Sequence, residues 1–188
     1  FDNAARPPKI TKNDTAVPHR GAPKREDRQA GFDRLAACRM KKIALEEHFL
    51  APGFEPYWLK TVEDVDPQLY GQVLARLNDF GEQRLAAMDT TGIEVSVLSI
   101  AGPGVQIEPD TAKAMKIARE GNDFLAKEIQ KRPDRYRGFA HLAVQDAKAA
   151  ADELERCVRD LKFCGAMING HTNGQYLDHP ANYPLWER

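Results

Sequence analysis

Short apolar runs alternate with longer stretches of helical spacing from Met40 onward, and this alternation constrains the fold more than any other feature. The runs are rich in β-branched and other apolar residues, whereas apolar residues in the stretches between them recur at every third or fourth position. Strands that alternate with helices predict a parallel sheet with crossover helices. The expected strands are residues 43–45, 95–100, 136–144 and 165–169, and the expected helices are residues 68–89, 111–131 and 147–161.

Individual residues predict where these elements begin and break. Asp110 and Asp146 precede two helical stretches, and their side chains are suited to N-cap them. Gly81 interrupts the stretch at 68–89, which therefore predicts two helical pieces. Residues 51–56, with two prolines and a glycine, are expected to form a loop after the first strand.

The number of strand–helix units bounds the architecture. Four units in about 149 residues fit half of a (β/α)₈ barrel, which typically needs about 250 residues. Residues 183–188 begin an amphipathic pattern that does not end. We therefore expect residues 40–188 to be the N-terminal half of a TIM-like α/β barrel, and the chain to be a fragment.

Composition excludes several classes of protein. The chain has 188 residues, 42% hydrophobic and 29% charged with a net charge of −1, which is typical of one soluble domain and excludes disordered and fibrous proteins. Its apolar runs fall short of the roughly 20 residues that a transmembrane helix needs. Three cysteines without C-x-x-C spacing indicate neither a disulfide framework nor a cysteine zinc site. These features favour a reducing cytoplasm.

Residues 1–39 differ from the rest of the chain. They carry nine Lys/Arg against five Asp/Glu, hold four prolines and show almost no apolar periodicity, which predicts a disordered basic arm. Acidic residues are interspersed and no aromatic residues interleave for base stacking, so binding to nucleic acid is not expected. Alternatively, Met40, just before the first strand, is the natural start of the protein, and residues 1–39 are upstream sequence wrongly included in the reading frame.

Glu46 and His48 end the first strand and are the leading candidates for metal ligands. Side chains alternate faces along a strand, so these two point the same way, about 7 Å apart along the backbone. A carboxylate and an imidazole at that spacing can reach one divalent ion. Polar residues also end buried strands because the chain is leaving the core. Catalytic zinc takes about three protein ligands, so further ligands are needed in either case.

Other polar and aromatic residues lie where barrel loops line an active site, after or near the ends of strands. Several have a structural alternative: loop packing for the aromatic residues, a loop-stabilising hydrogen bond for the histidine at 171, and burial inside the third strand for the histidine at 141. The candidates for substrate contact are Phe54, Trp58, Ser99, His141, Asn169 and His171.

Taken in order, the segments of residues 42–188 resemble the decarboxylase branch of the amidohydrolase superfamily, which includes γ-resorcylate, 5-carboxyvanillate and aminocarboxymuconate-semialdehyde decarboxylases. The resemblance is spread over several motifs rather than carried by one. Two of them are Ala44-Leu45-Glu46-Glu47-His48-Phe49 and Gly165-Ala166-Met167-Ile168-Asn169, and the others lie at residues 84–93, 98–99, 102–106, 132–136, 171–174 and 176–178.

The resemblance implies a metal-dependent barrel with Glu46 and His48 as first-strand ligands of one divalent ion, zinc or manganese. It also implies a ligand histidine from about the fifth strand and an aspartate from the eighth, which serves as the acid; both are expected beyond residue 188. The implied reaction is non-oxidative removal of CO₂ from a hydroxylated aromatic acid such as a dihydroxybenzoate, in an enzyme that is commonly a homo-oligomer.

Two alternatives stay open. The same barrel and metal could activate water to hydrolyse a lactone or an amide, as other members of the superfamily do. A half-barrel with two open sheet edges could also be an inactive truncated chain, or could act only when it pairs with another half.

Overall fold

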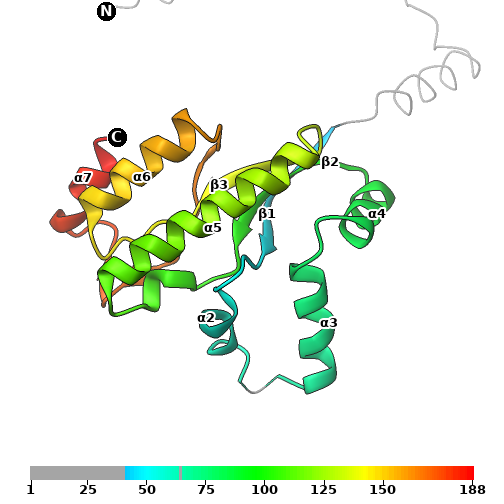
Figure 1. Ribbon diagram of the computed structural model, residues 1–188, viewed down its shortest axis with the longest axis horizontal. Coiled ribbons are helices and arrows are strands. Elements are labelled where there is room, and N and C mark those ends of the chain that lie inside the picture. The colour runs from blue at the N-terminus through cyan, green and yellow to red at the C-terminus, as the bar shows by residue number, and fades with distance from the viewer. Residues whose placement is uncertain (1–40, 64) are drawn as a thin grey trace, which may run out of the picture. The chain divides into compact units, whose positions relative to one another are not determined.

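The computed structural model describes residues 41–63 and 65–188, which form an α/β unit built on a parallel sheet (Figure 1). The basic segment predicted at residues 1–39, with Cys38, lies outside the described residues. The strand order β1-β2-β3-β4 follows the chain, and all three pairings are parallel, which confirms the predicted alternation. The strands are β1 (Lys42–Phe49), β2 (Ile93–Ile100), β3 (Tyr136–Ala140) and β4 (Gly165–Ala166).

Two helices begin where their predicted caps lie, whereas Glu55 and Pro56, expected in a loop, begin a short helix. Asp110 accepts from the backbone N–H of Lys113, and Asp146 accepts from those of Lys148 and Ala149. Gly81 separates two helices, as expected. None of the helices in the described ranges is long and apolar enough to cross a membrane. The helices are α2 (Glu55–Leu59), α3 (Pro67–Leu77), α4 (Glu82–Thr91), α5 (Thr111–Lys131), α6 (Ala147–Arg159) and α7 (Tyr183–Trp186), with 3₁₀ turns η1 (Gly104–Ile107) and η2 (Pro180–Asn182).

Strands β3 and β4 are shorter than predicted, and buried side-chain amides bond backbone groups beyond their ends. The amide of Asn122 accepts from the N–H of His141 (2.8 Å) and donates to its carbonyl (3.0 Å), directly after β3. The amide of Gln106 likewise accepts from the backbone N–H of Asn169 and donates to its carbonyl, after β4. A further difference is the short hairpin of β5 (His171–Thr172) and β6 (Gln175–Tyr176), which the sequence pattern did not indicate.

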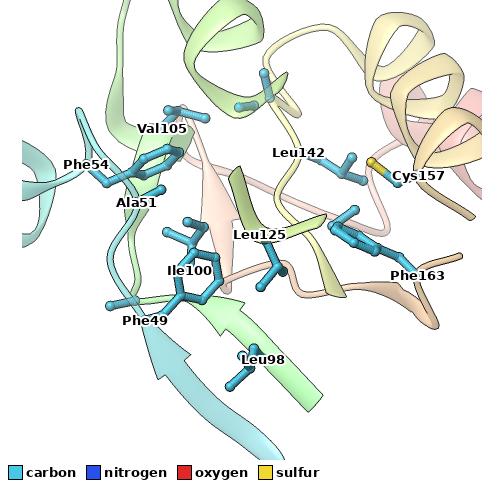
Figure 2. Close-up of a cluster of buried hydrophobic side chains, with 14 of the residues drawn as sticks. Phe49, Ala51, Phe54, Leu98, Ile100, Val105, Leu125, Leu142, Cys157 and Phe163 are labelled. Atoms are coloured by element: carbon cyan, nitrogen blue, oxygen red, sulfur yellow. The ribbon is translucent and has the colours of Figure 1, made fainter. Parts of the chain in front are cut away.

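The hydrophobic core lies between the sheet and helix α5. In Figure 2, Phe49, Leu98 and Ile100 of the first two strands surround Leu125 of α5, and Leu142 and Phe163 continue the cluster. Full burial of an aliphatic or aromatic side chain of this kind contributes about 1.5–3 kcal/mol to the free energy of unfolding. This core holds the sheet against α5.

The pairing of β1 with β2 contains an irregularity that changes which face each side chain occupies. Ala44 is paired with Ser96 and Glu47 with Leu98, so two residues of β1 stand opposite one residue of β2. Such a bulge reverses the inward and outward alternation beyond it. Strict alternation along β1, on which the sequence argument relied, is therefore interrupted between the two candidate metal ligands, because Glu46 is one of the two bulged residues and His48 follows them.

The loop after β2 packs closely against the end of β3. Gly104 has φ +57°, and a Cβ there would lie 2.3 Å from Nε2 of His141. The backbone N–H of Val105 donates to that same nitrogen at 3.0 Å. His141 is 3% exposed and packs against the edge of the Phe54 ring. Burial lowers the pKa of His141 from 6.5 to about 4, so the imidazole is a neutral acceptor that holds the loop.

The buried histidine predicts acid sensitivity. His141 is protonated below pH 6.5 in the unfolded chain but only below about pH 4 in the folded chain. The free energy of unfolding therefore decreases as the pH falls from 6.5 to about 4. The loss reaches about 3 kcal/mol. In the variant His141→Gln, whose amide oxygen can still accept from Val105, we expect this part of the pH dependence to disappear. Urea unfolding at pH 7.5, 5.5 and 4.5 measures it, and identical pH slopes for the two proteins would contradict it.

Candidate functional site

Glu46 and His48 approach each other at the carboxyl end of β1. The distance between Glu46 Oε1 and His48 Nε2 is 4.0 Å, and the two side chains are 82% and 38% exposed. They line a surface hollow of about 610 Å³ together with Glu47 and residues of α3 and α4. The two predicted ligands are therefore adjacent and open to a small ion or molecule.

Ser99 orients the imidazole of His48. The bulge brings His48 opposite Ser99 of β2, and His48 Nδ1 lies 3.1 Å from the Ser99 hydroxyl, which is fully buried. When Nδ1 donates to that oxygen, Nε2 is left deprotonated and faces Glu46. Metal-binding histidines use this arrangement, because a partner on the second ring nitrogen fixes both the tautomer and the ring.

Arg84 fixes the backbone at the same point, and sequence reasoning did not identify it. Its guanidinium donates to the carbonyl of His48 at 2.7 Å and to that of Asp79 at 2.8 Å, and it lies 3.9 Å from a carboxylate oxygen of Glu47. Burial lowers the pKa of Arg84, although the side chain keeps these partners. Arg84 thus joins α4 to the end of β1. Nothing in its position along a helical stretch indicated a partner 36 residues earlier.

The donor set suits zinc or manganese, since a carboxylate oxygen and an imidazole nitrogen serve both ions. The ring orientation fits as well, because Nε2 faces Glu46 while Nδ1 lies beside Ser99. Across residues 41–63 and 65–188, no group of three or more His, Cys, Asp or Glu side chains converges as a metal cage would require. Among the described residues, the predicted ligands Glu46 and His48 therefore stand as a pair without a third such side chain beside them.

The predicted aromatic contacts lie inside the protein. Phe54 is fully buried and packs against His141 and Tyr57. Trp58 is 7% exposed and stacks on Tyr70, with ring centroids 5.3 Å apart. In this structure both rings connect the loop after β1 to the core.

The remaining predicted residues follow the ends of β3 and β4. His141 is buried against the loop after β2, as described above. Asn169 is partly exposed, and its side chain lies against Gly102 of that loop. His171, in β5, is exposed and meets the ring of Tyr176 edge-on. Asn169 follows β4 at the edge of the sheet where the carboxyl ends of the parallel strands meet, as Glu46 and His48 do at β1. It lines a hollow with His171 that is separate from the hollow lined by Glu46 and His48.

Comparison with known proteins agrees with this geometry. The chain matches the amidohydrolase family over residues 44–188. It is 44% identical over 155 residues to the gamma-resorcylate decarboxylase of Rhizobium sp. (strain MTP-10005), a match that covers 77% of this chain and 45% of that protein.

Two solved structures are similar. One is 2,6-dihydroxybenzoate decarboxylase complexed with 2,6-dihydroxybenzoate, with a TM-score of 0.73 and 44% identity over 79% of this chain and 47% of that one. The other is dihydroxybenzoic acid decarboxylase from Polaromonas sp. JS666 with bound manganese and the inhibitor 2-nitroresorcinol, with a TM-score of 0.72 and 40% identity over 78% of this chain and 45% of that one. The chain spans about half the length of the relatives it matches. It belongs to the amidohydrolase family, and the three relatives described above are decarboxylases of dihydroxybenzoates.

Proposed function

We propose that this chain supplies the first four strand–helix units of a (β/α)₈ barrel, and that the complete protein removes CO₂ from a hydroxylated aromatic acid with the help of a divalent metal. The observation that carries the proposal is the Glu46–His48 pair, with Nε2 of His48 facing the carboxylate and Nδ1 braced by Ser99. The similarity to dihydroxybenzoate decarboxylases, one of them with bound manganese, supports both the reaction and the metal.

Glu46 and His48 hold the metal, zinc or manganese, in the proposed site. When bound, a divalent ion neutralises the carboxylate and the adjacent phenolate of the substrate and orients them. Ser99 keeps His48 in the tautomer that can ligate. The further ligands and the acid that protonates the ring carbon come from the second half of the barrel. The 188-residue chain alone is then expected to do no chemistry.

Asn169 is the proposed contact for a substrate hydroxyl. Of the predicted contacts after β3 and β4, it is the one whose side chain is partly exposed at the strand ends while its backbone is anchored in the protein. His171 is more exposed and lies in the following hairpin, so we place it at the rim of the site. Phe54, Trp58 and His141 support the loops from inside.

The metal assignment predicts the behaviour of variants of the complete reading frame. We expect the purified protein to contain about one zinc or manganese ion and to release CO₂ from 2,6-dihydroxybenzoate. A Glu46→Ala, His48→Ala double variant should lose both. Glu47→Ala is the matched control, because this neighbouring carboxylate faces Arg84, and it should keep its metal. Elemental analysis and a CO₂ assay measure the outcomes.

The possible results separate the alternatives. Metal without CO₂ release, together with hydrolysis of a lactone or an amide, would replace the decarboxylase by a hydrolase on the same barrel. A protein that holds no metal in any preparation would overturn the Glu46–His48 assignment. Activity of the isolated 188-residue chain would contradict the half-barrel proposal, and its size in solution would then show whether two copies are needed.

The contact between Ser99 and His48 predicts a smaller effect on metal affinity at the same site. Ser99→Ala removes the partner of Nδ1, so we expect the affinity for manganese or zinc to fall by about 10- to 100-fold while the fold persists. Ser96→Ala is a control on the same strand, since the buried Ser96 hydroxyl has no hydrogen-bond partner among the described residues. Calorimetric metal titration of the three proteins distinguishes them. Equal affinities in the wild type and Ser99→Ala would remove Ser99 from the site.

A further inference from the structure

Gln106 makes an unusually complete set of hydrogen bonds for a loop side chain. It lies in η1, after β2, and is 2% exposed. Its Oε1 accepts from the backbone N–H of Asn169 (2.7 Å) and from Nδ2 of that residue (3.2 Å). Its Nε2 donates to the backbone carbonyl of Asn169 (3.1 Å) and to the hydroxyl of Thr172 (2.8 Å). Both donor hydrogens and both acceptor positions of the amide are thereby used.

These contacts determine which way the amide of Asn169 faces. Its Nδ2 donates to Gln106 Oε1 and lies 3.4 Å from the carbonyl oxygen of Pro103. If the amide were turned over, its oxygen would face those two acceptors, an arrangement that costs two hydrogen bonds and adds repulsion. The side chain also packs directly on the loop backbone, because a Cβ at Gly102 would lie 2.8 Å from Asn169 Oδ1. Within the described part of the chain, no hydrogen-bond donor reaches Oδ1.

We propose that Gln106 is a positioning residue that acts through Asn169: it occupies the amide donors and leaves only Oδ1 to accept a hydrogen bond from the substrate. An acceptor selects a ligand group that carries a hydrogen, such as a phenol, and disfavours a carboxylate. Gln106 thereby contributes to the choice of a hydroxylated acid without touching it. This inference rests on the proposed function, in which Asn169 contacts a substrate hydroxyl.

A double-mutant cycle tests whether Gln106 works through Asn169. Gln106→Met keeps the side-chain volume and removes all four hydrogen bonds, and Asn169→Ala removes the acceptor. In the complete protein we expect each single variant to lower kcat/KM for 2,6-dihydroxybenzoate by about 10- to 100-fold. The kcat/KM of the double variant should be within about threefold of that of Asn169→Ala, because the effects of two residues that act as a unit are not additive.

Gln145→Met is the matched control. Gln145 also holds the loop after β2, since its Nε2 donates to the carbonyls of Val105 (2.6 Å) and Glu108 (2.8 Å), but it has no hydrogen bond to Asn169. Its effect on kcat/KM should multiply with that of Asn169→Ala. If Gln106 only supported the loop, the effects of Gln106→Met and Asn169→Ala on kcat/KM would multiply in the same way. Gln106→Glu, which replaces the donor by an acceptor facing the Asn169 carbonyl, serves in the cycle if Gln106→Met does not fold.

Crystal structures of the two glutamine variants give a readout that is independent of activity. We expect the Asn169 amide to rotate in Gln106→Met and to stay in place in Gln145→Met. If the wild-type protein decarboxylates no hydroxybenzoate, the proposed function fails, while the orientation of Asn169 still decides whether Gln106 positions it. An unrotated Asn169 in Gln106→Met, or multiplicative effects in the cycle, would overturn the inference.

Discussion

The parallel pairing of β1 with β2 is the constraint on which the rest of this structure depends. It brings His48 beside Ser99 and Phe49 beside Ile100, so one pairing sets both the polar end of β1 and the packing of its last aromatic residue. The extra residue in β1 before Glu47 decides which of these side chains faces which way. Arg84 then ties the carbonyl of His48 to α4, so the candidate ligands stand on a backbone held from two directions.

Local signals predicted the main strands and helices and the start of two helices, but not the β5–β6 hairpin or the length of β3 and β4. The N-caps Asp110 and Asp146 and the break at Gly81 were predictable because each acts on neighbouring residues. The side-chain contacts beyond β3 and β4 were not, since they come from Asn122 and Gln106, which lie 19 and 63 residues before their partners His141 and Asn169. A single buried amide that bonds the backbone beyond a strand does not change the apolar periodicity from which strands are predicted.

The candidate site could likewise be predicted from the sequence only in part. Spacing alone suggested that Glu46 and His48 share a face, and they do lie 4.0 Å apart, although strict alternation is broken by the bulge beside them. Ser99 was recognisable only as a polar residue near a strand end, and its partner Nδ1 becomes evident from the pairing register. Arg84 and Gln106 were missed because each reads as an ordinary polar residue until its buried partners are known.

The outer edge of β1 bears on how this chain behaves at high concentration. Ile43 and Leu45 are 60% and 59% exposed on a strand whose one neighbour, among the described residues, is β2. Aliphatic side chains beside free backbone N–H and C=O groups form a ready template for another strand. Association through such an edge is second order in protein, so dilution, rather than a change of buffer, is the direct way to keep these molecules apart.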